Sequence, residues 1–278
     1  MSDATDQAAR RQRFDLGGVD VLVEGDGAST LLMIHGWPDT HRLWDAQVAH
    51  FERRWRCVRF TLPGFDLAKP RRTATLDQLV ALLLAIADRA SPDRPVTLVM
   101  HDWGCVFGYE FAARHPARVA GVVSIDVGDV NSAAFARTLS AGQKLGVLGY
   151  QVWNALAWLV GGGIGDRMMR AMARRRGCPT DPRSIGASMG WPYAMRWFGV
   201  AGGLGKLAPV SPPRHPVLYL HGTRRSSKWH SPEWLALLDR SPVSAHEGFD
   251  TSHWIMLDAP EAFNASVERW LGHDAEGG

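Results

Sequence analysis

The sequence has little of what defines several classes of protein. It contains three cysteines among 278 residues, at widely spaced positions (Cys57, Cys105 and Cys178). This number and spacing predict neither a disulfide framework nor a zinc site, and they fit a reducing compartment. No apolar run reaches the ~18 residues of a membrane-spanning helix. The first thirteen residues are polar and lack the apolar segment of a signal peptide. We therefore expect a cytoplasmic protein.

Charge of one sign is also scarce. The 31 Lys and Arg residues are nearly balanced by 28 Asp and Glu residues, which leaves a formal net charge of +3 with mixed signs. Such a balance calls for neither a nucleic acid nor an anionic membrane as partner, and a homodimer is left open. The most apolar stretch, residues 147–164, contains Gln151, Asn154 and several glycines. We therefore predict a helix that ends in a Gly-rich turn, not a membrane anchor.

The most informative stretch of the chain is residues 96–105. Val96–Met100 has the composition of a buried strand, it ends abruptly in His-Asp-Trp-Gly, and an amphipathic helix follows. Asp102 is thus expected on a tight turn ahead of a helix N-terminus, where unpaired N–H groups and the helix dipole favour a carboxylate. Asp102 is either an ordinary helix cap or a nucleophile in the strand–turn–helix arrangement that usually reads Gly-x-Ser-x-Gly. As a nucleophile, a carboxylate suits attack on a saturated carbon, whereas serine attacks acyl carbons.

Two further segments favour the nucleophile. The apolar strand Leu31–Ile34 runs into His-Gly-Trp-Pro, a loop in which the backbone N–H of Trp37 can join that of Trp103 in a two-donor oxyanion hole. Near the C-terminus, His253 lies in a loop between a strand-like stretch at 243–246 and a predicted helix at 260–271. A histidine in a loop is usually a surface residue, and the chain has eleven histidines. Only the joint arrangement of nucleophile first and histidine last singles out His253 as a base.

Together these motifs resemble the epoxide hydrolase and haloalkane dehalogenase branch of the α/β-hydrolase superfamily. The resemblance extends over about residues 14–271. It rests on His35–Asp39 with Trp44 after it, on Thr61–Phe65, on His101–Gly104 and on Ser252–Trp254. This motif set is specific for a hydrolase with an aspartate nucleophile, and much less specific for which one. The resemblance also implies a helical cap in which two tyrosines donate hydrogen bonds to an epoxide oxygen. The expected cap contains two tyrosines, Tyr150 and Tyr193, although each can instead serve only in packing.

Strand and helix signals alternate along the first half of the chain, which indicates the α/β class with a mostly parallel sheet flanked by helices. A hairpin is expected at 14–24, with Gly17-Gly18 as its turn. Further strands are expected at 31–34, 57–61, 96–100, 121–126 and 216–220, and helices at 43–52, 76–89 and 106–114. Residues 14–127 and 214–273 are predicted to form the α/β-hydrolase core domain. Residues 128–213, which read as helices without strands, are predicted to form an all-helical cap domain above Asp102.

Twelve tryptophans are several times the usual share for a chain of this length. For most of them, including Trp153, Trp158, Trp191 and Trp197 in the expected cap, core packing is the favoured interpretation because an indole buries a large area. For Trp37 and Trp103 we favour a function, since the motifs place both beside the proposed oxyanion hole.

The chain departs from the pattern of the family at two places. Met100 stands where an elbow usually has glycine, and the small Gly104 and Cys105 are expected to relieve the crowding. The loop at 221–227 has no carboxylate, although many relatives carry there the acid that orients the base. Some relatives place this acid after the preceding strand, where Asp126 is our first candidate and Asp129 our second. Alternatively, Asp126 has a structural role only.

The predicted reaction has two steps and requires no metal or organic cofactor. Asp102 attacks a saturated carbon of a small apolar or aromatic epoxide while the cap tyrosines protonate the opening ring. His253, supported by Asp126, then activates water for hydrolysis of the ester, and the N–H groups of Trp37 and Trp103 stabilise the oxyanion. A haloalkane dehalogenase is the second interpretation, with Trp103 and a cap tryptophan holding the halide. A non-catalytic binding protein with this fold is the third, and a serine esterase is disfavoured.

Overall fold

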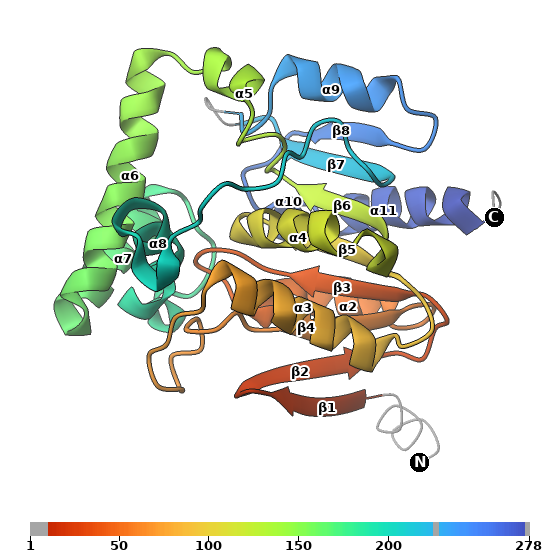
Figure 1. The fold of residues 1–278 in the computed structure, drawn as a ribbon, viewed down its shortest axis with the longest axis horizontal. Coiled ribbons are helices and arrows are strands. Elements are labelled where there is room, and N and C mark those ends of the chain that lie inside the picture. Colours follow the sequence, from red (N-terminus) through yellow and green to blue (C-terminus); the bar gives the residue numbers. More distant parts are fainter. Residues whose placement is uncertain (1–10, 225–227, 276–278) are drawn as a thin grey trace.

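An eight-stranded, mostly parallel sheet forms the centre of the molecule (Figure 1). The computed structural model describes residues 11–224 and 228–275. The strand order is β1-β2-β4-β3-β5-β6-β7-β8; β1, β2 and β4 pair antiparallel, and all other neighbours pair parallel. The strands are β1 (Arg11–Leu16), β2 (Val19–Glu24), β3 (Thr30–Ile34), β4 (Arg56–Phe60), β5 (Val96–His101), β6 (Val119–Ile125), β7 (Val217–Gly222) and β8 (Ala245–Phe249). The predicted α/β class is confirmed, as is the hairpin that turns at residues 17–18.

Helices cover both faces of this sheet, as the buried strands require. Side chains alternate between the faces of a strand, so Leu32 and Ile34 of β3 belong to one apolar cluster, and Leu31 and Met33 to the other. Helices α3 (Leu76–Ala90) and α4 (Trp103–Arg114) pack on the first face, and α2 (Asp45–Phe51), α10 (Ile255–Asp258) and α11 (Pro260–Ala275) on the second (Figure 1).

Some predicted limits differ from those observed. Helix α4 begins at Trp103 and not at Val106, so Asp102 directly precedes its first turn. Helix α9 (Pro232–Asp239) was missed, although Ser231 and Pro232 carry its start signal: the Ser231 hydroxyl accepts a hydrogen bond from a backbone N–H, and Pro232 is the first helical residue. The last strand lies at 245–249 and not at 243–246.

Between β6 and β7 the described chain forms helices and turns without a strand, as predicted. The main helices are α5 (Ala133–Thr138), α6 (Ala141–Val160), α7 (Gly162–Arg175) and α8 (Trp191–Phe198). Ser140 and Gln143 form a reciprocal cap at the start of α6, and Gly161 ends it, so the predicted Gly-rich helix end is present. These helices stand to one side of the sheet (Figure 1). The limits 128–213 for a separate cap domain stay a prediction.

None of the helices in the described ranges, 11–224 and 228–275, combines the length and apolar character needed to cross a membrane. Part of the loop at 221–227 that lacks the expected acid, residues 225–227, lies outside these ranges.

Candidate active site

Asp102 occupies a strained turn between β5 and α4. Its backbone has φ 52° and ψ −121°, a region that residues other than glycine rarely adopt and that is common at functional sites. The backbone N–H of Trp37 donates a 2.7 Å hydrogen bond to Oδ1 of Asp102. The loop comes this close only because residue 36 is glycine: a Cβ there would lie 2.5 Å from both Asp102 Oδ1 and Trp103 N. The motif therefore serves to bring a backbone donor against the carboxylate.

The electrostatics of this turn keep Asp102 ionised. Burial by itself would raise the pKa of Asp102, but hydrogen bonding to His253, the charge of His253 and the backbone N–H of Trp103 outweigh it. The pKa of Asp102 consequently lies below the ordinary value of a carboxyl group. At neutral pH the side chain is a carboxylate, which is the form a nucleophile requires.

The crowding expected at Met100 is relieved one turn further along α4 than predicted. A Cβ on Gly108 would lie 2.0 Å from the sulfur of Met100, so the absence of a side chain at Gly108 makes room for the methionine. Gly104 has another neighbour, the carbonyl oxygen of Ile34, which a Cβ would approach to 2.3 Å. Gly104 therefore does not make room for Met100, because the long methionine side chain reaches the next turn, whereas the thiol of Cys105 donates to the carbonyl oxygen of Met100 at 3.3 Å.

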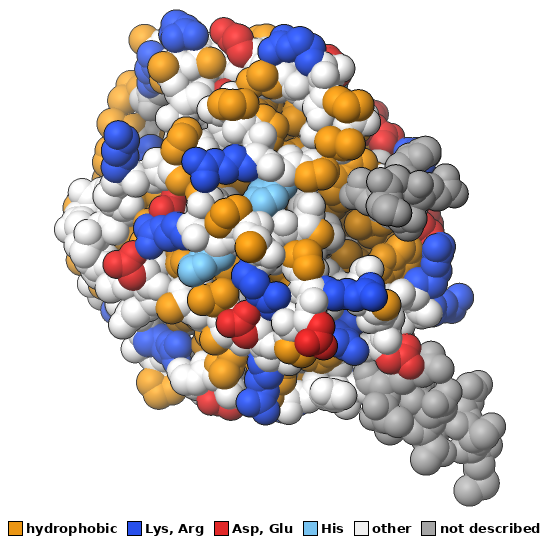
Figure 2. Space-filling model, turned by 45° about the vertical axis from the view of Figure 1, so that its right-hand side comes forward, with side chains coloured by type: hydrophobic (Ala, Val, Ile, Leu, Met, Phe, Trp, Pro, Cys, Tyr) orange, Lys and Arg blue, Asp and Glu red, His pale blue; other side chains and the backbone are white. Residues whose placement is uncertain are grey.

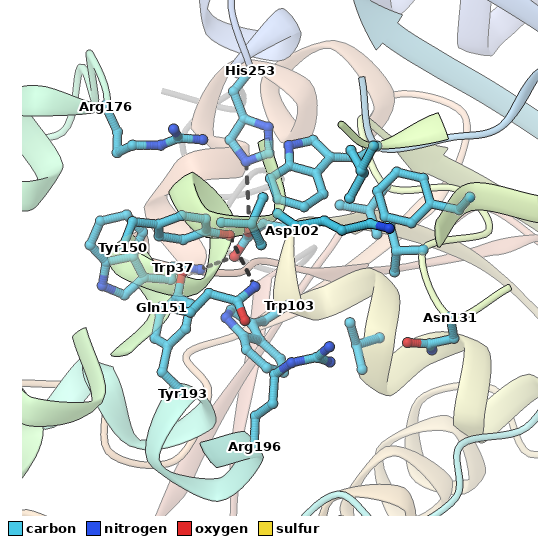
Figure 3. A pocket seen from close by; sticks show the side chains of 18 of the residues that line it. Trp37, Asp102, Trp103, Asn131, Tyr150, Gln151, Arg176, Tyr193, Arg196 and His253 are labelled. Carbon is cyan, nitrogen blue, oxygen red and sulfur yellow. Dashed lines mark hydrogen bonds and ion pairs between the residues drawn. The ribbon is translucent and has the colours of Figure 1, made fainter. Parts of the chain in front are cut away.

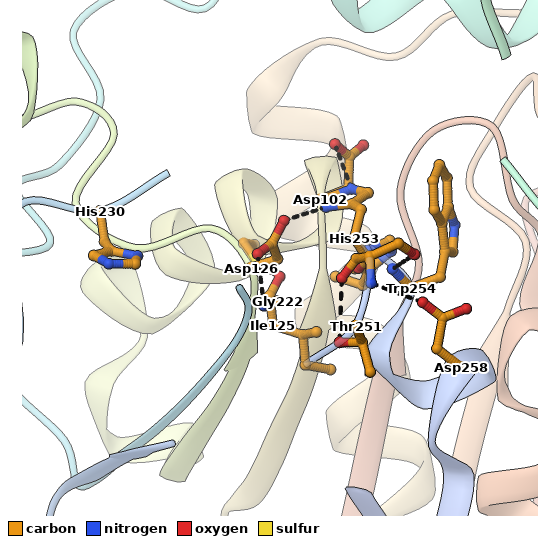
Figure 4. A network of polar contacts seen from close by, with 12 residues as sticks. Asp102, Ile125, Asp126, Gly222, His230, Thr251, His253, Trp254 and Asp258 are labelled. Atoms are coloured by element: carbon orange, nitrogen blue, oxygen red, sulfur yellow. Dashed lines mark hydrogen bonds and ion pairs between the residues drawn. The ribbon is translucent and has the colours of Figure 1, made fainter. Parts of the chain in front are cut away.

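His253 lies between Asp102 and Asp126 (Figure 4). Its Nδ1 is 2.5 Å from Oδ2 of Asp126, and its Nε2 is 3.6 Å from Oδ2 of Asp102. Nδ1–H donates to Asp126, so that Nε2 is the nitrogen that faces Asp102. The other oxygen of Asp126 accepts a hydrogen bond from the N–H of Gly222 at 3.1 Å, and Asp126 has a φ of 57°. Two carboxylates and an imidazole are thus brought together from three loops.

Asp129, the second candidate for the acid, has other partners. Its carboxylate accepts hydrogen bonds from the hydroxyl groups of Ser132 and Ser231 and from the N–H of Ser231. It ties the start of the helical region to the loop before α9. The geometry favours Asp126 over Asp129 as the partner of His253.

Two buried residues next to His253 were not assigned a role from the sequence. The ring of His101 lies 4.3 Å from that of His253, and its Nε2–H donates to the carbonyl oxygen of His253. Burial lowers the pKa of His101 to about 3, so it stays neutral. Asp39 accepts hydrogen bonds from the indole of Trp254 and from the hydroxyl of Thr180, which belongs to the helical region. Their place beside the catalytic motifs in the sequence was the only signal available.

A cavity of about 270 Å³ opens above Asp102 (Figure 3). Both tyrosines line it, together with Trp37, Trp103 and His253. The buried Tyr193 packs edge-on against Trp37 and Trp103, with ring centroids 5.8 and 5.2 Å apart, and its centroid lies 6.0 Å from that of Tyr150. Tyr193 lies in the first turn of α8.

The two tyrosines differ in what surrounds their hydroxyl groups. Burial and, after it, the charge of Asp102 raise the pKa of Tyr193 well above its usual value. The hydroxyl of Tyr150 accepts a hydrogen bond from Gln151, whose carbonyl oxygen in turn accepts one from Trp197. Gln151 and Trp197 were not recognised from the sequence as partners of a pocket residue.

Three cations, Lys144, Arg176 and Arg196, also line the cavity. The guanidinium of Arg176 lies over the ring of Tyr150, 4.7 Å from its centroid. Asp102 is the only carboxylate among the lining residues of this cavity. The cavity therefore disfavours a cationic substrate.

The tryptophans divide as expected, with two exceptions. Most are buried, but Trp153 and Trp197 in the helical region are exposed. The indole N–H of Trp37 donates to the sulfur of Met169 and so does not point at the cavity. Within the described ranges, no group of three or more His, Cys, Asp or Glu side chains is arranged to hold a metal ion.

Comparisons with known proteins agree with this geometry. A family model described as "alpha/beta hydrolase fold" matches residues 29–151. Probable oxidoreductase EphD of Mycobacterium bovis is 34% identical over 116 residues, which are 39% of this chain and 20% of that protein. Cis-3-alkyl-4-alkyloxetan-2-one decarboxylase of Xanthomonas campestris is 29% identical over 174 residues, 54% of this chain and 55% of that protein. The chain thus spans between a fifth and about half of the length of these two relatives.

Among solved structures, an epoxide hydrolase of Bacillus megaterium in complex with an inhibitor has a TM-score of 0.68 at 19% identity, covering 94% of this chain and 100% of that one. Haloalkane dehalogenases are found among both the sequence relatives and the structural neighbours. The chain therefore has the α/β-hydrolase fold, and it is similar to the epoxide hydrolase and haloalkane dehalogenase branch of that superfamily.

Proposed function

We propose that this protein hydrolyses a small apolar or aromatic epoxide through an ester of Asp102. One observation carries the proposal: the strained turn after β5 holds a carboxylate, and two phenols line the cavity into which that carboxylate faces. A carboxylate is suited to opening a ring at a saturated carbon, and a neutral phenol can supply the proton that the departing oxygen needs.

In the first step, Oδ2 of Asp102 attacks one epoxide carbon from the side opposite the ring oxygen. The carbon–oxygen bond breaks, and the oxygen takes a proton from Tyr150 or Tyr193, which gives a hydroxyalkyl ester and a phenolate. Oδ1, which already accepts from the N–H of Trp37, becomes the carbonyl oxygen of the ester. The positively charged side chains of Lys144, Arg176 and Arg196, which line the cavity, stabilise the transient negative charge of the phenolate.

In the second step, Nε2 of His253 takes a proton from water, and the hydroxide attacks the carbonyl carbon of the ester. The negative charge forms on the oxygen held by the N–H groups of Trp37 and Trp103. Asp126 stabilises the imidazolium. When the intermediate collapses, the diol leaves as its alkoxide and takes up the proton from His253. The collapse leaves Asp102 as a carboxylic acid, which gives its proton to the phenolate, so that Asp102 and the phenol are both restored and the net reaction is addition of one water to the epoxide.

Two other substrate classes are weaker candidates. A haloalkane dehalogenase needs donors for the departing halide, and the sequence pointed to Trp103 and a cap tryptophan. None of the four tryptophans at 153, 158, 191 and 197 is among the cavity-lining residues, and the indoles of Trp37 and Trp254 donate to Met169 and Asp39, which leaves Trp229, outside the helical region, as the other tryptophan that lines the cavity with Trp103. An oxetan-2-one is a strained four-membered lactone, and the decarboxylase relative shares the longer of the two reported alignments with this chain. Both classes therefore belong in the test.

The remaining interpretations have lost support. The binding-protein hypothesis rested on the missing acid in the loop at 221–227, but Asp126 lies 2.5 Å from His253. A serine esterase needs its serine on the elbow. The letters Gly-x-Ser-x-Gly occur at 186–190, where Ser188 lies in a 3-10 turn of the helical region and not between β5 and α4.

The deciding experiment is turnover of a matched panel in water enriched in heavy oxygen. The panel is styrene oxide, a bromoalkane of similar size and a cis-3,4-dialkyl oxetan-2-one, with release of diol, bromide and carbon dioxide as readouts. We expect diol from the epoxide and, over repeated turnovers, heavy oxygen in the Asp102 carboxylate. Asp102→Ala is the negative control and should be inactive on all three.

Each other outcome excludes a part of the proposal. Release of bromide or of carbon dioxide without formation of diol would show that the substrate is not an epoxide, while leaving the site in place. Diol without label in Asp102 would remove the ester. Full activity of Asp102→Ala would exclude Asp102 as the nucleophile. The absence of a reaction with any of the three substrates would favour a binding protein.

A further inference from the structure

Helix α6 exposes a row of large apolar side chains on its outward face. The residues that it buries against the rest of the protein are Gln151, Asn154, Ala155 and Ala157. Six of its larger apolar side chains point the other way and are between 38% and 68% exposed: Leu145, Leu148, Trp153, Leu156, Leu159 and Val160. We call these six side chains the α6 face. Between Lys144 and the end of the helix at Val160 no residue is charged, so the face is continuous and apolar.

The α6 face concentrates the exposed apolar surface of the molecule. Nine of the twelve large apolar side chains that are exposed in the described chain lie on α6, α7 and α8. In addition to the six side chains of the α6 face, the nine include Ile164, Trp197 and Phe198. On the face of the molecule shown in Figure 2, by contrast, apolar, basic and acidic side chains are mixed. Single exposed leucines need no explanation, but a cluster of this kind marks an interaction surface.

The same region carries the positive charge of the protein. Residues 128–213 contain ten Lys and Arg but three Asp and Glu, a net charge of +7, whereas the rest of the chain has a net charge of −4. Of the three acids, Asp129 is buried and Asp181 is paired with Arg183. The overall value of +3, from which we expected no membrane partner, hides this separation of charge.

We infer that the α6 face docks the protein onto a membrane surface that contains anionic lipids. Apolar side chains together with an excess of Lys and Arg are the combination that binds a helix into the headgroup region of such a surface. A second copy of this chain fits less well. In a two-fold dimer the same face would meet itself, so two regions of +7 would be placed against each other.

Docking in this way would bring the cavity close to the lipid. Lys144, Val147, Tyr150 and Gln151 of α6 line the cavity, and α6 stands on the side of the helical region that is remote from the sheet (Figure 1). The helix would therefore lie between the cavity and the proposed membrane surface. An apolar substrate dissolved in the bilayer would then reach Asp102 over a short path. The docking itself does not depend on the proposed function, whereas this use of it does.

The test is co-sedimentation of the full chain with vesicles. Vesicles of phosphatidylcholine alone are compared with vesicles that also contain phosphatidylglycerol, at low and at high salt. We expect binding to the anionic vesicles at low salt, weaker binding to the neutral ones, and a loss on addition of salt because screening weakens the attraction. Leu156→Glu/Leu159→Glu should lower the partition coefficient at least about tenfold, since each buried leucine contributes strongly.

A matched control is available on the core. Val243 and Leu257 are 51% and 38% exposed, similar to Leu156 and Leu159 at 42% and 51%. Val243→Glu/Leu257→Glu adds the same charge and should bind as the wild type does. Thermal unfolding of both variants checks the fold, and Leu156→Ala/Leu159→Ala should give an intermediate loss.

Three results would overturn the inference. They are no binding to anionic vesicles, equal losses in the two glutamate variants, and a wild-type dimer in light scattering that Leu156→Glu/Leu159→Glu dissociates. The last result would assign the α6 face to a second copy. Because none of these readouts uses catalysis, failure of the docking and failure of epoxide hydrolysis can be told apart.

Discussion

The two sides of the cavity are built by different means. On the sheet side, each residue of the proposed mechanism lies just beyond the carboxyl end of a strand: Trp37 follows β3, Asp102 follows β5, Asp126 follows β6 and His253 follows β8. Strained turns and short hydrogen bonds hold them. On the opposite side, Tyr150 and Tyr193 lie on helices and are held by ring packing and, for Tyr150, by a hydrogen bond from Gln151.

This difference suggests a division of labour. A group at a strand end is fixed by the whole sheet, so it suits the roles of nucleophile, base and oxyanion donor, for which small displacements are costly. A group on a packed helix can be exchanged without disturbing the sheet. We therefore expect mutations on the sheet side to abolish a step, and mutations on the helical side to slow a step or change its substrate.

The largest effect is expected at His253. His253→Gln should leave the attack of Asp102 intact but remove the base for the second step, so that turnover falls by at least about 10⁴-fold. Mass spectrometry of the protein after addition of an epoxide should show the ester on the peptide that contains Asp102. Turnover near that of the wild type, without a trapped ester, would contradict the assigned order of steps.

The next effect is expected at the acid. Asp126→Asn tolerates the same left-handed backbone but cannot stabilise the imidazolium, so ester hydrolysis should slow on the order of 10³-fold. Rapid-mixing kinetics should show fast ester formation in a single burst followed by slow release of diol. The first step needs no charge on Asp126 and should keep its rate.

Asp129→Asn is the matched control for this variant. It should hydrolyse the ester at the rate of the wild type but unfold more easily, because Asp129 accepts hydrogen bonds from Ser132 and Ser231. A burst in Asp129→Asn and none in Asp126→Asn would exchange the two roles. If neither variant shows a burst, His253 does not need a charged partner to activate water.

The same comparison explains how far the sequence predicts the site. A strand end is visible as an abrupt change from apolar to polar letters, so Asp102, His253 and the preference for Asp126 over Asp129 could be predicted. The accommodation of Met100 could not, since it depends on Gly108 on the neighbouring helix. Asp39 was also missed as a buried partner, because its contacts with Trp254 and Thr180 join segments far apart in the chain.

The helical side was less predictable. The sequence indicated that residues 128–213 are helical and contain the two tyrosines, but not which helix face meets the cavity. Helix α6 shows why: the usual rule, that the apolar face is the buried one, would turn its leucines inward, and the structure turns them outward. Nothing in the sequence indicates that the usual rule fails for this helix. The contacts of Gln151 and Trp197 follow from the same unexpected orientation.

On the helical side, Tyr193→Phe should slow opening of the epoxide by about 10- to 100-fold, because one proton donor is lost and the other remains. Tyr150→Phe should behave similarly, and the double variant should lose most of the activity. Ester hydrolysis after the ring has opened should keep its rate, which single-turnover measurements can separate. If both steps slowed equally in Tyr193→Phe, the phenol would be supporting Trp37 and Trp103 by packing and not donating a proton.

The smallest effect on turnover, and a distinct effect on stability, is expected at Asp39, which joins the two sides through Thr180 and Trp254. Burial raises the pKa of Asp39 from 3.8 to about 6, against the opposing hydrogen bonds from Thr180 and Trp254. When the pKa of a carboxyl group is higher in the folded than in the unfolded protein, the folded protein is more stable while that group is protonated. The folded protein therefore loses stability as the pH rises from about 4 to about 6, and the loss remains above pH 6.

Asp39→Asn cannot ionise and should escape this loss. The free energy of unfolding of the variant minus that of the wild type should increase by about 2.5 kcal/mol between pH 4 and pH 7.5, because each pKa unit is worth about 1.4 kcal/mol and a part of the loss is already present at pH 4. Urea unfolding at the two pH values measures the difference, and its absolute value at pH 4 reports the separate cost of replacing an acceptor by an amide. Parallel curves for the two proteins would mean that Asp39 ionises without penalty, and the contact between the helical region and the sheet would then not depend on pH through this residue.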